Sequence, residues 1–155
     1  MITASARRGV TALELLLAIA LVAIIATLLA SGFSLFRRSV AVGAATETTL
    51  AVLAEARSRT LGSRDAASWG VHFETSRIVL YKGPAFSEGA AGNEVTALGG
   101  DVRIATIALA GGGSDVLFDR LTGATSQAGT ITIEHAHDAS RFRVITVLAT
   151  GIASL

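Results

Sequence analysis

Two histidines near the carboxyl end are the residues best suited, by type and spacing, to start a metal site. His135 and His137 stand two residues apart in the stretch EHAHD. On a strand they would share one face, because side chains alternate with a period of two. A zinc site needs three or four ligands, and His72 could supply a third only through the tertiary fold. We therefore expect a polar hairpin at this place, with no metal and no cofactor.

The other residue types that could form a catalytic, phosphate-binding or calcium site are absent or lack the sequence pattern that such a site needs. The chain has no cysteine, which excludes thiolate catalysis and disulfides. No serine lies in a nucleophile-elbow pattern. The stretch 111–114 (GGGS) lacks the lysine and the helix of a phosphate-binding loop, and Asp115 and Asp119 lack the spacing of a calcium loop. We therefore expect a protein that is not an enzyme.

A single carboxylate, Glu14, borders a long apolar run. The 22 residues from Leu15 to Phe36 carry no charge; as a helix they would extend about 33 Å, enough to cross a bilayer core of about 30 Å. Arg7 and Arg8 precede the run, which favours a cytoplasmic N-terminus. A plain membrane anchor leaves Glu14 unexplained, because an acidic residue inside a spanning helix costs about 2.5–3.5 kcal/mol, although less near the helix end. A secretory signal has a shorter apolar region of about 7–15 residues.

The stretch RRGVTALELLL (7–17) resembles the class III signal of type IV pilins and type II secretion pseudopilins. In that family a basic leader ends in glycine, a membrane peptidase cuts after the glycine, and the new N-terminus is methylated. Glutamate is the fifth residue of the product. The resemblance implies cleavage between Gly9 and Val10, N-methylation of Val10, and a role in subunit assembly for Glu14. Two departures are Val10, where phenylalanine or methionine is commoner, and Ser31–Gly32, where the family often has a proline.

Helical character continues beyond the apolar run. Six apolar residues follow one another at helical spacing, and Gly62 is a candidate helix stop. These residues are Val42, Ala45, Leu50, Leu53, Ala54 and Leu61. We expect four segments: a leader (1–9), a transmembrane assembly helix (10–36), an amphipathic helix (37–62) and a β-rich domain (63–155).

The β-rich domain consists of short apolar runs separated by glycine and polar residues. We expect an α+β fold in which the long N-terminal helix packs on a small antiparallel sheet of about six strands. Between the second and third strands, 83–100 (GPAFSEGAAGNEVTALGG) is expected to be a long mobile loop. The predicted strands are 69–74, 77–83, 102–109, 115–119, 130–135 and 141–149.

The carboxyl-terminal half resembles the globular domain of GspH/FimT-like minor pseudopilins. There, a strand with a phenylalanine precedes a glycine turn, a hydrophobic strand, and a strand with an arginine that leads to a final glycine. The residues that follow this order are Phe118, Gly123, Ile131, Ile133, Arg143, Ile145 and Gly151.

The two resemblances imply a structural subunit of a type IV pilus or a type II secretion pseudopilus. Its partners would be other pilin or pseudopilin subunits, a prepilin peptidase, an inner-membrane assembly platform and membrane lipid. It would cross the inner membrane once, with the N-terminus in the cytoplasm, before entering an extracytoplasmic filament. The alternative is a minor pilin that binds DNA or a surface at the filament tip. FimT-like proteins implicated in DNA uptake carry arginines after the final glycine, whereas residues 152–155 are uncharged; Arg141 and Arg143 are expected to be solvated on an edge strand.

Overall fold

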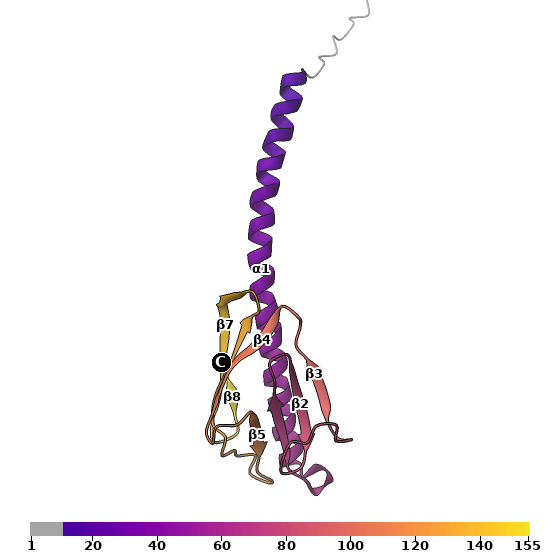
Figure 1. Ribbon diagram of the computed structural model, residues 1–155, viewed down its shortest axis with the longest axis vertical. Helices are drawn as coiled ribbons and strands as arrows, with labels where there is room; N and C mark the ends of the chain where they lie inside the picture. Colours follow the sequence, from indigo (N-terminus) through magenta and orange to yellow (C-terminus); the bar gives the residue numbers. More distant parts are fainter. Residues whose placement is uncertain (1–10) are drawn as a thin grey trace, which may run out of the picture. The chain divides into compact units, whose positions relative to one another are not determined.

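The computed structural model describes residues 11–155, except for the side chains of residues 30, 31, 34 and 35. The chain divides into two compact units, of which the first ends at Arg37 and the second is Arg38–Leu155. One long helix, α1 (Ala12–Leu61), contributes to both units (Figure 1). Val10, where the helix was predicted to begin, and Gly9 lie outside the described residues.

The first unit contains the amino-terminal part of α1. Its stretch Ala12–Leu29 is long and apolar enough to cross a membrane, and none of it is buried. Leucine, isoleucine and valine side chains project on every side of this helix and are exposed. A helix that is apolar all round needs an apolar surrounding, so the prediction of a helix suited to a membrane is confirmed.

The carboxyl-terminal part of α1 buries one stripe against the domain. Leu50 is half-buried and packs against the core, as predicted, whereas Ala54 and Leu61 are exposed, so these two predicted members of the stripe were wrong. Threonines take their place, because a threonine can bury its methyl group while its hydroxyl bonds to the carbonyl one turn earlier. The buried positions recur every three to four residues: Val42, Ala45, Thr46, Thr49, Leu53, Ala56 and Thr60.

The helix ends at Leu61, as predicted, but the residue that terminates it is not the predicted Gly62. The Gly62 N–H still donates to the carbonyl of Ser58 at 2.9 Å, as in a regular helix. The left-handed conformation that terminates helices is adopted by Ser63, with φ of 47°. A short 3-10 helix, η1 (Arg64–Ala66), then leads to the first strand.

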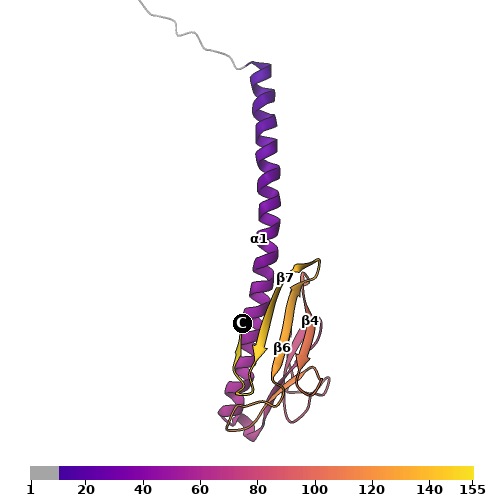
Figure 2. The same ribbon diagram turned by 90° about the vertical axis from the view of Figure 1, so that its left-hand side faces the viewer.

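Within residues 11–155, eight strands form two antiparallel four-stranded sheets, where we had predicted one sheet of about six strands. The first sheet has the order β3-β2-β1-β5 and the second β4-β6-β7-β8, and both lie beside the carboxyl-terminal half of α1 (Figures 1 and 2). The bounds are β1 Trp69–Phe73, β2 Arg77–Lys82, β3 Glu94–Ala97, β4 Val102–Leu109, β5 Asp115–Phe118, β6 Gly129–His135, β7 Asp138–Val147 and β8 Ala153–Ser154.

Strand β3 lies within the segment that was predicted to be a mobile loop. It pairs with β2, with Val95 opposite Val79. Arg59 on α1 fixes the start of β3 by ion-pairing with Glu94, its Nη2 lying 3.0 Å from Oε2. Leu98, immediately after the strand, is buried in the core. This strand is short and Val95 points to solvent, so its sequence has little apolar alternation.

One hydrophobic core joins α1 to both sheets. The first sheet contributes Val71, Phe73 and Ile78 among others, and the second contributes Ile131, Ile133 and Ile145. In each case the contributing residues alternate along the strand, as expected for strands with one buried face. The α+β class is therefore confirmed, with a helix packed against two small sheets.

Candidate functional site

The start of α1 places Thr11 and Glu14 in direct contact. The Thr11 hydroxyl oxygen accepts a hydrogen bond from the Glu14 backbone N–H at 3.2 Å. The Thr11 carbonyl accepts from the Leu15 N–H at 3.1 Å. Thr11 is therefore the N-cap of the helix, and Glu14 occupies the third helical position, where the capping-box pattern places a glutamate.

This arrangement gives Glu14 a local environment that the sequence reasoning overlooked. A carboxylate in the first turn interacts favourably with the positive end of the helix dipole. The signal was present in the sequence, because Thr11-x-x-Glu14 before an apolar run is the pattern of a helix start. Glu14 is exposed, and its immediate neighbours Leu13, Leu15 and Leu16 are exposed as well. Within residues 11–155, no basic group forms an ion pair with Glu14, so its carboxylate remains open to an outside partner.

The remaining residues of the predicted signal, Gly9 and Val10, lie outside the described part of the chain. Cleavage between them and methylation of Val10 therefore stay predictions. The described residues do show where Glu14 lies relative to the start of the helix. Glu14 lies one helical turn from the end of the helix at which any new N-terminal amine would be created.

His135 and His137 do not share a strand face, the arrangement that a metal site would have needed. His135 ends β6 and is buried, whereas His137 lies exposed in the two-residue turn that leads to β7. The His135 Nδ1 accepts a hydrogen bond from the His137 backbone N–H at 3.2 Å, so one imidazole nitrogen is used to shape the turn. The expectation of a polar hairpin is confirmed.

His72 belongs to a different cluster, on the first sheet. Its Nδ1 lies 2.9 Å from the Asp115 Oδ1, and its ring stacks on Phe86 with centroids 3.9 Å apart. Asp119 lies in the following turn, where its carbonyl accepts from the Gly123 N–H. In the part of the chain that the structure describes, no three histidine or carboxylate side chains gather as a metal would require.

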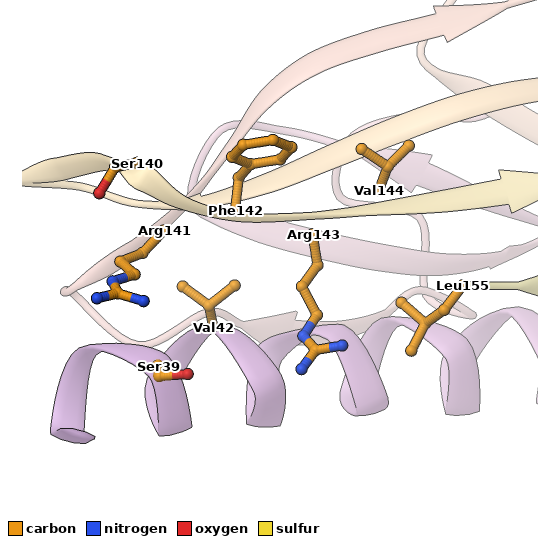
Figure 3. Close-up of a pocket in the computed structure, with 8 residues that line it drawn as sticks. All are labelled: Ser39, Val42, Ser140, Arg141, Phe142, Arg143, Val144 and Leu155. Atoms are coloured by element: carbon orange, nitrogen blue, oxygen red, sulfur yellow. The ribbon is translucent and has the colours of Figure 1, made fainter. Parts of the chain in front are cut away.

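A groove of about 370 Å³ separates the beginning of β7 from α1 (Figure 3). Arg141 and Arg143 reach from β7 toward the helix, whose Ser39 and Val42 form the opposite wall. Neither arginine forms an ion pair with any residue that the structure describes. Both arginines are exposed, as predicted, although they lie on the face of β7 that points toward the helix. The prediction of an edge strand was wrong in the sheet order, because the short strand β8 follows β7 and pairs with it at Thr146 and Val147.

A third arginine close to this groove is neutralised. Arg38 Nη1 lies 3.2 Å from Asp138 Oδ2 and ties α1 to the first residue of β7. The Ser140 hydroxyl also donates to Asp138, at 2.6 Å. These hydrogen bonds, that from Ser140 first, lower the pKa of Asp138 below its usual value. The groove therefore keeps the positive charge of Arg141 and Arg143 alone.

Comparison with models of known protein families, with characterised proteins and with solved structures found no match. The residues of the chain and their geometry are therefore what supports a function.

Proposed function

We propose that this protein is a structural subunit of an extracytoplasmic filament, a minor pilin or pseudopilin that assembles through α1. The observation that carries the proposal is Glu14, the one acidic residue in the first turn of an apolar helix. The basic stretch 7–8 and Gly9 precede it at the spacing of a prepilin signal. The proposal assigns the chain no catalytic activity.

The exposed surface of the amino-terminal helix supports this function. Apolar side chains such as Leu17, Val22 and Leu28 are exposed around the helix, and such a surface in water marks a contact with lipid or protein. In the precursor that contact would be the inner membrane, crossed once with the N-terminus in the cytoplasm. In the filament it would be the helices of neighbouring subunits.

The second unit supports the same function, because it has a core of its own. A filament subunit needs a part that remains folded outside the membrane while its helix moves from lipid to protein. Arg38–Leu155 forms a separate compact unit in which α1 supplies one wall of the core. Its fold suits display on a filament surface.

Glu14 has two roles in this proposal. Within the subunit, it occupies a favourable position at the capped start of the helix. Between subunits, its carboxylate pairs with the amine of Val10 that cleavage creates on a neighbour. A charge in an apolar surrounding needs such a partner, and the described residues leave the carboxylate unpaired. Partners are thus a prepilin peptidase, an assembly platform and other subunits.

The test is the N-terminus of the protein isolated from its native host. We expect mass spectrometry to find a chain that begins at Val10 and carries one N-methyl group. Gly9→Val should block cutting, because a branched side chain replaces a hydrogen at the scissile bond. Ala6→Val is the matched control, since it makes a similar change within the leader but away from the bond, and it should be cut normally. An intact Met1 terminus in peptidase-competent cells would refute the proposal.

A further inference from the structure

Strand β7 has an edge that is open over most of its length. On one side it pairs with β6 from Phe142 to Val147, and again at Asp138 beyond an irregularity at residues 139–141. On the other side it pairs with β8 only at Thr146 and Val147. The stretch before Ile145 therefore has a strand neighbour on one side only. Open edges are templates on which another extended chain can pair.

The backbone groups on this open edge follow from the pairing with β8. The Leu148 N–H donates to the Ile152 carbonyl at 2.9 Å, so Leu148 directs its backbone groups toward the β8 side. These directions alternate along a strand. Thr146, Val144 and Phe142 therefore direct their N–H and C=O groups to the same side, and β8 reaches only Thr146.

The side chains of this stretch alternate between charge and apolar surface. Arg141 and Arg143 lie on the face that points toward α1, while Phe142 and Val144 point the other way (Figure 3). Phe142 is 56% exposed and Val144 is 37% exposed. A strand added beside β7 would therefore meet arginine on one face and apolar groups on the other.

We propose that the open edge of β7 binds an extended acidic segment of a partner protein as an additional strand. Carboxylates at every second residue of that segment pair with Arg141 and Arg143 in the groove. The residues between them pack beside Phe142 and Val144. Main-chain hydrogen bonds to Phe142 and Val144 supply affinity, and the charge pattern supplies specificity. This inference stands independently of the filament function, because it uses only residues of the second unit.

Charge decides which occupant fits the edge. A second copy paired through β7 would bring Arg141 and Arg143 close to their own counterparts, and like charges on neighbouring strands repel. A free phosphate or a nucleic acid would satisfy the arginines and leave the edge N–H groups of Phe142 and Val144 without a partner. An acidic strand satisfies both sets of groups together.

The experiment uses the full-length protein in zwitterionic detergent micelles and two fluorescent peptides. In the first, glutamate alternates with valine; the second has the same composition with the glutamates in one block. We expect the alternating peptide to bind at least about tenfold more tightly, since only its carboxylates match the period of β7. Hydrogen exchange of the Phe142 and Val144 amides should slow when it binds.

Variants separate the two sources of affinity. Arg141→Glu and Arg143→Glu should each weaken binding of the alternating peptide, and the double variant should prefer a peptide in which lysine alternates with valine. Arg120→Glu is the control for net charge, because Arg120 is exposed elsewhere and forms no ion pair with a described residue. Val144→Pro removes one N–H from the open edge and should weaken binding, whereas Val144→Thr should not.

Three results would overturn the proposal. One is equal binding of the alternating and block peptides, and another is the absence of peptide binding. The third is unchanged exchange at Phe142 and Val144 while duplex DNA or anionic lipid vesicles bind through the two arginines. That third result would make the groove a phosphate site instead.

Discussion

The backbone of Gly151 packs directly against the carbonyl oxygen of Gly123. A Cβ atom at Gly151 would overlap that oxygen, and both glycines have positive φ, 76° and 63°. The same oxygen accepts a hydrogen bond from Arg57 Nε at 3.2 Å. The turn between β7 and β8, the turn after β5 and helix α1 therefore meet at one point, where there is no room for a side chain.

Gly151→Ala should destabilise the second unit strongly. The left-handed backbone costs a non-glycine residue about 1–2 kcal/mol, and the overlap with Gly123 adds a displacement of about 1–3 kcal/mol. Urea unfolding of a fragment spanning residues 38–155 measures the loss. Gly112→Ala is the control, because Gly112 has φ of 71° with nothing within 4 Å of an added Cβ. Equal losses for the two variants would show that the contact with Gly123 does not matter.

The buried threonines of α1 should differ in importance. The Thr60 hydroxyl oxygen accepts from the Trp69 backbone N–H at 3.0 Å, and Thr60→Val leaves this buried donor without its acceptor, at a cost of about 1–3 kcal/mol. The Thr49 hydroxyl donates only to the Ala45 carbonyl, which the helix already uses. Thr49→Val should therefore change the free energy of unfolding by no more than about 0.5 kcal/mol. The idea fails if the two variants unfold at the same urea concentration.

These threonines also explain what the sequence could and could not predict. Helical spacing correctly indicated that α1 presents a buried stripe, and Val42, Ala45 and Leu53 lie on it. Counting apolar residues chose Ala54 and Leu61 in place of the threonines, because polarity alone does not reveal a hydroxyl that bonds to its own helix.

For the strands and for the candidate site, too, the sequence predicted some features and missed others. Alternation located six of the eight strands, and it missed β3 and β8, which have four and two residues. Their pairing depends on partners elsewhere in the chain, β2 for β3 and the end of β7 for β8. Spacing could likewise suggest that His135 and His137 share a strand face, but His135 ends β6 and His137 lies in the turn that follows. The direction in which Arg141 and Arg143 point depends on how β7 packs against α1. The sequence around the two arginines does not determine that packing.

A fragment that begins at Arg38 should fold alone, and shorter fragments should be progressively weaker. Beginning at Thr46 removes the buried side chains of Val42 and Ala45, which together contribute about 2–4 kcal/mol. Beginning at Trp69 removes α1 and exposes the inner faces of both sheets, which should cause aggregation. Sedimentation and thermal unfolding measure the series. A cooperative, monomeric transition in the fragment from Trp69 would mean that α1 is not part of the core.

The ion pair between Arg59 and Glu94 should make stability depend on pH. Hydrogen bonds from Arg59 lower the pKa of Glu94 below its ordinary value of 4.5. As the pH falls through that value, the unfolded chain takes up the proton first, so the contribution of Glu94 is present above pH 4.5 and is lost below it. The difference in free energy of unfolding between the wild type and Glu94→Gln should therefore shrink in acid.

The effect of Glu94 should be small and sensitive to salt, because its side chain is 56% exposed. Glu47→Gln is the control, since Glu47 is exposed on α1 and forms no ion pair with a described residue. Its difference from the wild type should stay constant from neutral pH into acid. A similar trend for both variants would show that the Arg59 contact contributes nothing specific.

Thr11 makes it possible to separate the two roles of Glu14. Thr11→Val removes the oxygen that caps α1 and keeps the carboxylate; the loss of the cap should cost the helix start about 0.5–2 kcal/mol. Glu14→Leu keeps the cap and removes the carboxylate, and Glu14→Gln keeps a polar group without charge. If the carboxylate pairs with the Val10 amine of a neighbouring subunit, Glu14→Leu should be inserted and cut after Gly9 but should enter filaments poorly.

The comparison is the yield of sheared filaments relative to the membrane precursor for the three variants. We expect near-normal incorporation of Thr11→Val, because the loss of one hydrogen bond at the helix end leaves the charge in place. Glu14→Gln should fall between Thr11→Val and Glu14→Leu, because an amide can still accept a hydrogen bond from the amine. Equal defects in Thr11→Val and Glu14→Leu would mean that Glu14 serves the helix start alone. Normal incorporation of Glu14→Leu would remove the carboxylate from assembly altogether.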